Sequence, residues 1–97
     1  MVERMIVIIT VGTQFEERYE ETLRCEVTVS DDATISEVLE EAKRECLPKV
    51  PVLDKPHKIP YLYLMHPDTL QKLDEEKPAG EFGIEDGSIL RLMSSTR

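Results

Sequence analysis

The sequence predicts a protein of the α+β class, in which one main helix packs on one face of a single β-sheet. Several segments alternate apolar and polar residues with a period of two, as strands do, whereas one segment has apolar residues at helical spacing. The order is two strands, a helix, a strand, a short strand and a last strand. A helix that follows a hairpin and precedes further strands packs across the sheet. The length of 97 residues suits one domain, so we expect residues 1–97 to form a single unit.

The first strand is expected over residues 4–11, whose β-branched run is typical of a central strand. Ile6 and Ile8 share parity with the polar residues Arg4 and Thr10, so we expect this set on the outer face of the sheet. The residues expected in the core are Met5, Val7, Ile9 and Val11.

The second strand is expected over residues 19–29, which also alternate with a period of two. Phe15, Tyr19 and Leu23 are four residues apart, as on a helix, so the start of this element has two interpretations. Its β-branched end favours a strand. The residues that would share its core face are Tyr19, Leu23, Cys25, Val27 and Val29.

The helix is predicted to begin after Thr34, because Thr34 and Glu37 have the spacing of a capping box. Pro48 ends it, since proline cannot continue a helix. A set of apolar residues recurs at helical spacing and should face the sheet. These residues are Ile35, Val38, Leu39, Ala42 and Cys46.

The second half of the chain contains a loop and the remaining strands. Four prolines between residues 48 and 60 predict an irregular crossing segment. Residues 61–66 alternate as a strand, a short edge strand is expected over residues 69–73, and Asp86-Gly87 should form a turn before a last strand over residues 88–93. We expect Ser94–Arg97 to be a flexible tail.

The first and last strands can both be central only if they lie parallel and adjacent. This arrangement is a β-grasp fold, with a mixed sheet of four to five strands and one helix.

The charge balance argues against nucleic acid as a partner. The chain has 20 acidic and 12 basic residues, for a net charge of −8, and such a surface repels phosphate backbones. No apolar run approaches the length of a membrane span, so we expect no membrane insertion. The amino-terminal apolar run is too short for a signal peptide and follows Glu3, which favours a cytoplasmic location.

The two cysteines, Cys25 and Cys46, are far apart in sequence, and free buried thiols are the favoured interpretation. A disulfide is the alternative, because both fall on predicted core faces. A zinc site made by these cysteines with His57 and His66 is disfavoured, since the four residues include no closely spaced ligand pair. We therefore expect no metal and no cofactor.

No enzyme is expected. Neither histidine is flanked by a nucleophile or an orienting acid, and the acidic cluster at residues 74–76 is typical of a solvated surface. The four glycines are isolated turn residues and form no phosphate-binding loop.

Three segments resemble the ubiquitin-like family, over nearly the whole chain. They are VTVSDDATISEVLEEAK at residues 27–43, YLYL at 61–64 and GEFGIEDGSILRLM at 80–93. The last resembles the closing segment of the family. The chain looks closest to small bacterial ubiquitin-like proteins, including those associated with type VII secretion and those encoded beside bacterial conjugation enzymes.

The resemblance implies two alternative functions. Modifiers and sulfur carriers of this family end in Gly-Gly and are activated as adenylates by an ATP-dependent enzyme, whereas this chain ends in MSSTR. We therefore favour a non-covalent interaction module, whose partner is another protein such as a secretion-system component. In the alternative, the carboxylate of Arg97 is joined to a target by an activating enzyme.

The outer face of the sheet is the predicted binding surface. The outward parity of three strands converges there, and the family carries its hydrophobic recognition patch on this face. Isoleucine, tyrosine, methionine and arginine are common at protein interfaces. The predicted partner-binding residues are Ile6, Ile8, Tyr61, Tyr63, Met65, Arg91 and Met93.

Overall fold

The computed structural model describes residues 3–15, 18–49 and 61–95. The long elements of this part are β1 (Arg4–Phe15), β2 (Arg18–Ser30), α1 (Ile35–Cys46), β3 (Tyr61–Met65) and β4 (Ile89–Ser95). Two short 3₁₀ helices accompany them, η1 (Leu47–Lys49) and η3 (Ala79–Phe82). Most of the predicted proline-rich crossing segment, residues 50–60, lies outside the described residues.

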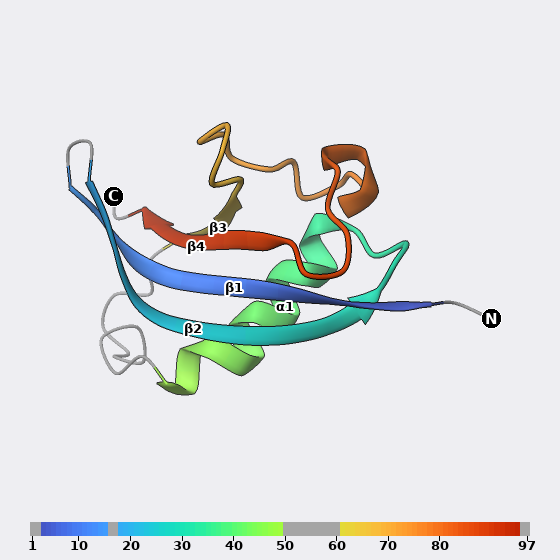
Figure 1. The fold of residues 1–97 in the computed structure, drawn as a ribbon, viewed down its shortest axis with the longest axis horizontal. Helices are drawn as coiled ribbons and strands as arrows, with labels where there is room; N and C mark the ends of the chain where they lie inside the picture. The colour runs from blue at the N-terminus through green and yellow to red at the C-terminus, as the bar shows by residue number, and fades with distance from the viewer. Residues whose placement is uncertain (1–2, 16–17, 50–60, 96–97) are drawn as a thin grey trace.

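The sheet has the strand order β2-β1-β4-β3 in the described part of the chain (Figure 1). β1 and β4 lie parallel at the centre, with Ile9 opposite Leu90, and the other two pairs are antiparallel. The predicted β-grasp arrangement is therefore confirmed. The short edge strand expected over residues 69–73 is reduced to an isolated bridge between Met65 and Lys72.

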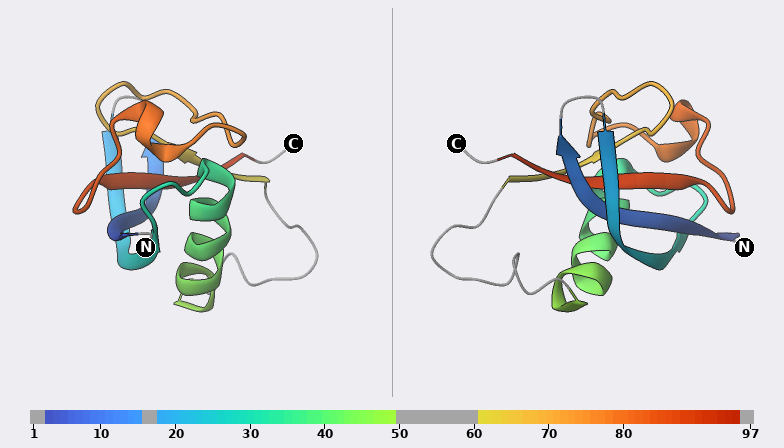
Figure 2. Two further views of the ribbon diagram at one scale, coloured as in Figure 1. Left: turned by 90° about the vertical axis from the view of Figure 1, so that its right-hand side faces the viewer. Right: turned by 60° about the vertical axis from the view of Figure 1, so that its left-hand side comes forward.

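Helix α1 covers one face of this sheet (Figure 2). Its start is held by the predicted capping box: the Glu37 amide donates to Thr34 Oγ1 at 3.3 Å, and the Thr34 hydroxyl donates to Glu37 Oε1 at 3.4 Å. All five residues predicted for the apolar stripe of the helix are buried. They meet a layer of strand residues that is also buried, namely Met5, Val7, Ile9, Val11, Cys25, Val27, Val29, Leu62, Leu64, Leu90 and Leu92.

A β-bulge changes the start of β2. Val11 lies opposite Leu23 but Gly12 lies opposite Glu21, so Thr22 is an extra residue in the ladder. A Cβ atom at position 12 would collide with the carbonyl oxygen of Glu20, which explains the glycine. The segment is a strand, so its helical interpretation is wrong.

The bulge also corrects the predicted position of Tyr19. The extra residue reverses the alternation of side chains before it, because a one-residue shift exchanges the two faces of a strand. The Tyr19 hydroxyl consequently lies 3.1 Å from Thr10 Oγ1, on the side of the sheet opposite α1.

β4 is longer than expected. It continues through Ser94 and Ser95, which lie opposite Leu62 and Tyr61 of β3. The sequence predicts a flexible tail that includes these two serines, so this part of the prediction is wrong. The ladder with β3 holds their backbone instead, while Thr96 and Arg97 lie outside the described residues.

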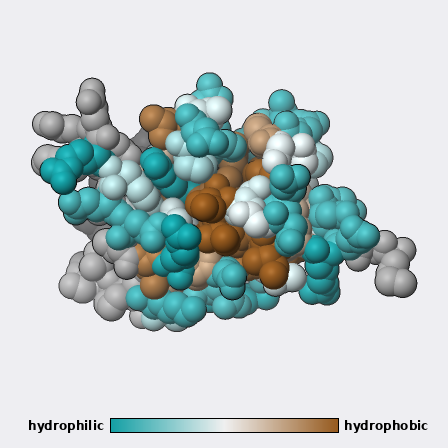
Figure 3. All heavy atoms as spheres, viewed as in Figure 1, coloured by the Kyte–Doolittle hydropathy of each residue, from teal (hydrophilic) through white to brown (hydrophobic). Residues whose placement is uncertain are grey.

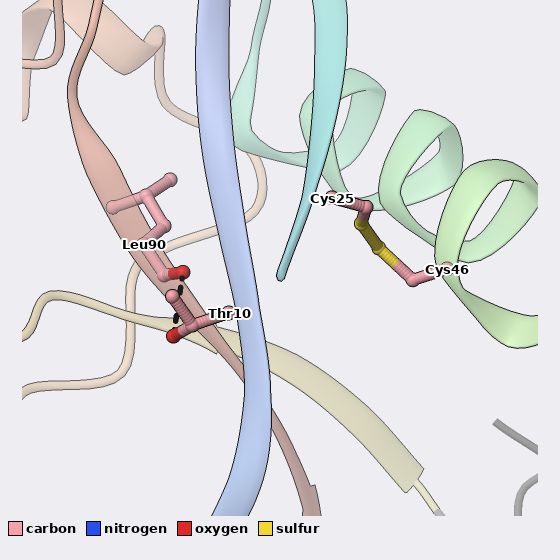
Figure 4. Close-up of a disulfide and its surroundings, with 4 residues drawn as sticks. All are labelled: Thr10, Cys25, Cys46 and Leu90. Carbon is pink, nitrogen blue, oxygen red and sulfur yellow. Dashed lines mark hydrogen bonds between the residues drawn. A yellow bond between two sulfur atoms is a disulfide. The ribbon is translucent and has the colours of Figure 1, made fainter. Parts of the chain in front are cut away.

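Cys25 and Cys46 form a disulfide, which corrects the preference for free thiols (Figure 4). Their Cα atoms are 6.2 Å apart, within the usual range for a disulfide. The bond joins the core face of β2 to the last turn of α1. Disulfides persist mainly in oxidising compartments, although intracellular proteins of hyperthermophiles also carry them. The expected cytoplasmic location therefore stays a prediction.

None of the helices in the described ranges is long and apolar enough to cross a membrane.

Reduction of the disulfide should destabilise the protein, because the bond closes a loop between residues 21 positions apart. A loop of this size corresponds to about 3 kcal/mol of unfolding free energy in the chain-entropy account. We expect a clear fall in the urea midpoint when a thiol reductant is added. The double variant Cys25→Ala/Cys46→Ala is the control, since its midpoint should not respond to reductant. Two free thiols in the denatured, unreduced protein, titrated with an alkylating reagent, would contradict the disulfide.

Candidate functional site

The candidate site is the face of the sheet opposite α1, which we call the outer face. It faces the viewer in Figure 1, with α1 behind the strands. Figure 3 shows apolar side chains at the centre of this face, surrounded by hydrophilic ones. A region of this composition is a candidate for contact with another protein.

Three isoleucines form the apolar centre, which we call the isoleucine patch. Ile8 of β1 lies opposite Ile89 of β4, and Ile6 is the next outward residue of β1. Ile6 is 43% exposed and Ile89 is 39% exposed, while Ile8 is half-buried between strands. Large side chains that remain this exposed at the centre of a sheet do not contribute fully to the stability of the core.

The Asp86-Gly87 turn fixes this patch. The Ile6 amide donates to Asp86 Oδ1 at 2.7 Å, and the Gly87 amide donates to the Ile6 carbonyl at 2.7 Å. The Ile8 amide then donates to the Ser88 carbonyl at 2.8 Å. Gly87 has a φ of 89°, which confirms the predicted left-handed position in the turn. These bonds place the start of β4 against β1 and so bring Ile89 beside Ile8.

A polar cluster lies beside the isoleucine patch, where Thr10, Tyr19 and Arg91 meet. Thr10 is only 3% exposed, and its hydroxyl donates to the Leu90 carbonyl at 3.4 Å (Figure 4). Because the Thr10 proton is used in this way, the Tyr19 hydroxyl donates to Thr10 Oγ1. The Arg91 guanidinium lies 4.0 Å from the centre of the Tyr19 ring, in cation–π contact. The cluster therefore holds the Arg91 side chain across the sheet.

A second cation lies on the same face at Arg24 of β2. Arg24 is opposite Thr10 in the ladder, and it donates a hydrogen bond to Glu21 at 3.0 Å. This hydrogen bond, together with the negative charge of Glu21, raises the pKa of the Arg24 guanidinium above its ordinary value. An arginine guanidinium is protonated at neutral pH even at its ordinary pKa, so Arg24 is charged with or without this shift.

The structure brings together most of the predicted binding residues but does not expose all of them. Ile6 is exposed, and Ile8, Tyr63 and Arg91 are partly exposed on the outer face. Met65 and Met93 have the predicted parity but are 8% and 7% exposed, so they support the surface rather than form it. Tyr61 pairs with Ser95 in the ladder, and its side chain is outside the described part of the structure, as is Arg97.

Ile89 and Tyr19 lie on the outer face, although the sequence analysis did not place them there. Ile89 shares parity with Arg91 and Met93, so the alternation in the last strand could have identified it. Tyr19 could not be identified in this way, because the bulge at Thr22 has no clear signal in the sequence. Leu70, in the loop after β3, is another apolar residue with an exposed side chain, and 58% of its surface is exposed.

The cysteines cannot supply the thiolates of the disfavoured zinc site, since both are in the disulfide. Among the described residues, no group of three or more His, Cys, Asp and Glu side chains could hold a metal ion. His57 lies outside these residues.

The comparisons with known proteins concern the fold. No protein-family model and no curated protein matches the sequence. A ubiquitin from Caldiarchaeum subterraneum superposes on the structure with a TM-score of 0.64 and 17% identity, over 98% of each chain. The fold is ubiquitin-like. A designed protein based on ubiquitin gives a TM-score of 0.62 and 21% identity, over 97% of this chain and 92% of the other.

These similarities confirm the ubiquitin-like fold that the sequence motifs implied. The finer resemblance to bacterial proteins of type VII secretion or of conjugation operons stays a prediction. At these identities the ubiquitin-like fold does not define a partner or a reaction, because one fold serves many functions.

The polar cluster gives a testable prediction about the outer face. Replacing Thr10 by Val and Tyr19 by Phe removes the two hydroxyls with little change in shape. Each single variant should lose about 0.5–1.5 kcal/mol of unfolding free energy, the usual net value of a hydrogen bond. A double-mutant cycle measured by urea unfolding should give a coupling energy above about 0.5 kcal/mol. Additive losses would show that the two hydroxyls do not interact.

Proposed function

We propose that this ubiquitin-like domain is a non-covalent interaction module that binds a protein partner through its outer face. The observation that carries the proposal is the isoleucine patch, three large apolar residues on a rigid sheet, of which Ile6 and Ile89 are about two-fifths exposed. Exposed apolar groups of this kind, rimmed by polar residues, are typical of interaction sites.

The charged and aromatic residues around the isoleucine patch indicate which chemical groups a partner would present to it. Arg91 is held in place by Tyr19, and Arg24 keeps a charged guanidinium on the same face. Arginine and tyrosine are common among the residues that dominate binding energy. We therefore propose a partner that presents an apolar side chain to Ile6 and Ile89 and a carboxylate to Arg91.

The modifier or sulfur-carrier hypothesis requires a flexible segment between the last strand and the activated carboxylate. The pairing of β4 with β3 extends to Ser95. Ser94 and Ser95 therefore cannot act as this segment, and residues after Ser95 would have to supply it. The pairing therefore places the start of any such segment after Ser95. Catalysis is not part of the proposal.

The test compares acidic substitutions inside and outside the isoleucine patch. Ile6→Asp and Ile89→Asp add one negative charge each at the patch. Leu70→Asp is the matched control, because it also replaces an exposed apolar residue by aspartate, and Leu70 is more exposed than Ile6 or Ile89. Leu70 has a positive φ of 58°, which aspartate tolerates. Thermal unfolding of each variant verifies that it is folded.

Partners are first captured from lysate of the source organism with the wild-type domain and identified by mass spectrometry. Each purified candidate is then titrated against the three variants by calorimetry. We expect at least a tenfold rise in Kd for Ile6→Asp and Ile89→Asp, equivalent to about 1.4 kcal/mol, and little change for Leu70→Asp. Equal affinity of all three variants for every candidate would exclude the outer face as the binding site.

A further inference from the structure

The disulfide between Cys25 and Cys46 lies in the hydrophobic core. Cys25 is 5% exposed and Cys46 is fully buried. Figure 4 shows the bond between β2 and the last turn of α1. Thiol–disulfide exchange begins when a thiolate reaches one of the two sulfur atoms. A reductant can therefore attack this bond only after part of the fold has opened.

Cys25 is held in place by the ladder between β1 and β2. It lies opposite Ile9, near the middle of a ladder that runs from Arg4 to Phe15 of β1. β1 is in turn paired with β4 at the centre of the sheet. Cys25 consequently leaves the core only when the sheet itself separates.

The start of α1 is held by hydrogen bonds to a distant part of the chain. The Ile35 amide donates to the Lys77 carbonyl and the Ser36 amide donates to the Glu75 carbonyl, both at 2.9 Å. The capping box at Thr34 adds further bonds at the same end. This end of the helix is therefore fixed to the segment that precedes β4.

The last turn of α1 is held in a different way. The ion pairs near this end join helix residues to each other, namely Glu40 with Lys43 and Glu41 with Arg44. Cys46 is the buried residue of the last turn, and its disulfide ties the turn to β2. The ends of helices open more readily than a core does. Without the disulfide, the last turn can leave the sheet while the rest of the fold stays closed.

We propose that Cys25 and Cys46 form a redox switch that closes readily and opens slowly. In the reduced domain, opening of the last turn of α1 exposes the Cys46 thiol to a disulfide oxidant such as oxidised glutathione. In the oxidised domain this opening is blocked, because the bond ties Cys46 to a residue that the sheet holds. Reduction therefore requires unfolding of the whole domain.

The oxidation transfers two electrons from the two cysteines to the oxidant. The Cys46 thiolate attacks one sulfur of the oxidant, the S–S bond of the oxidant breaks, and one oxidant thiolate leaves. The turn then returns to the sheet, where the Cys25 thiolate attacks Sγ of Cys46 and releases the second oxidant thiolate. The protons lost by the two cysteines end on the two thiols of the oxidant.

The switch has a consequence for the life of the protein. A domain that folds in a reducing compartment can be oxidised later without unfolding, and it stays oxidised after the oxidant is gone. This behaviour is independent of binding at the outer face, because both cysteines belong to the core on the α1 side of the sheet.

The first test compares the urea dependence of the two reactions. Reduction of the oxidised domain by dithiothreitol and oxidation of the reduced domain by oxidised glutathione are each followed below the urea midpoint of that form. The logarithm of the reduction rate should rise with the full slope of global unfolding. The slope for oxidation should be less than about half of it, since a local opening exposes little surface.

Variants with one cysteine identify the thiol that reacts first. With Cys25→Ala, the Cys46 thiol should form a mixed disulfide with glutathione roughly tenfold faster or more than the Cys25 thiol does with Cys46→Ala. Glu81→Cys in the Cys25→Ala/Cys46→Ala background is the control, because residue 81 is exposed in η3 and its thiol reacts without any opening. Thermal unfolding verifies that each variant is folded.

Hydrogen exchange of the reduced wild-type domain locates the opening without any substitution. The Val38 amide donates to the Thr34 carbonyl at 3.1 Å, at the fixed end of α1. The Cys46 amide should exchange with a smaller urea slope than the Val38 amide, because only the last turn opens locally.

Four results would overturn the proposal. Reduction with a urea slope as small as that of oxidation would show that a local opening exposes the bond. Oxidation with the full slope of global unfolding, or equal slopes for the Cys46 and Val38 amides, would show that the last turn does not open by itself. A Cys25 thiol that reacts as fast as the Cys46 thiol would remove the assigned order. A reduced domain that is unfolded would leave no folded state to oxidise.

Discussion

The parallel pairing of β1 with β4 is the interaction on which the rest of the structure depends. The two strands come from opposite ends of the chain, and Ile9 and Leu90, which lie opposite each other, are fully buried. Bringing distant segments together costs chain entropy, which their buried side chains offset. The Asp86-Gly87 turn completes the junction through its bonds to Ile6.

This central pair determines which surfaces remain available to partners. One face of the sheet is covered by α1, and the disulfide between Cys25 and Cys46 fixes the end of the helix to β2. The opposite face carries Ile8 and Ile89 side by side because the two strands are in register. Among the described residues, β2 is the outermost strand on its side of the sheet. The position of the isoleucine patch thus results from this strand order.

Local patterns in the sequence predicted much of this fold. The alternation in residues 4–11 and the capping box at Thr34 and Glu37 depend on neighbours in the chain, and the structure confirms both. Features that depend on distant segments were missed. The bulge that moves Tyr19 to the outer face reflects pairing with β1, and the disulfide depends on how α1 lies over β2. For the candidate site, parity identified the face, but the burial of Met65 and Met93 depends on tertiary packing that parity does not describe.

Residue-resolved hydrogen exchange tests the central role of the β1–β4 pair most directly. The amide of Ile8 donates to Ser88 at the start of β4, so it should exchange only when the whole domain unfolds. Its exchange free energy should then equal the unfolding free energy measured with urea, and it should fall with urea at the same slope. Exchange of Ile8 through a local opening of much lower free energy, while α1 and β2 stay protected, would show that the core does not depend on this pair.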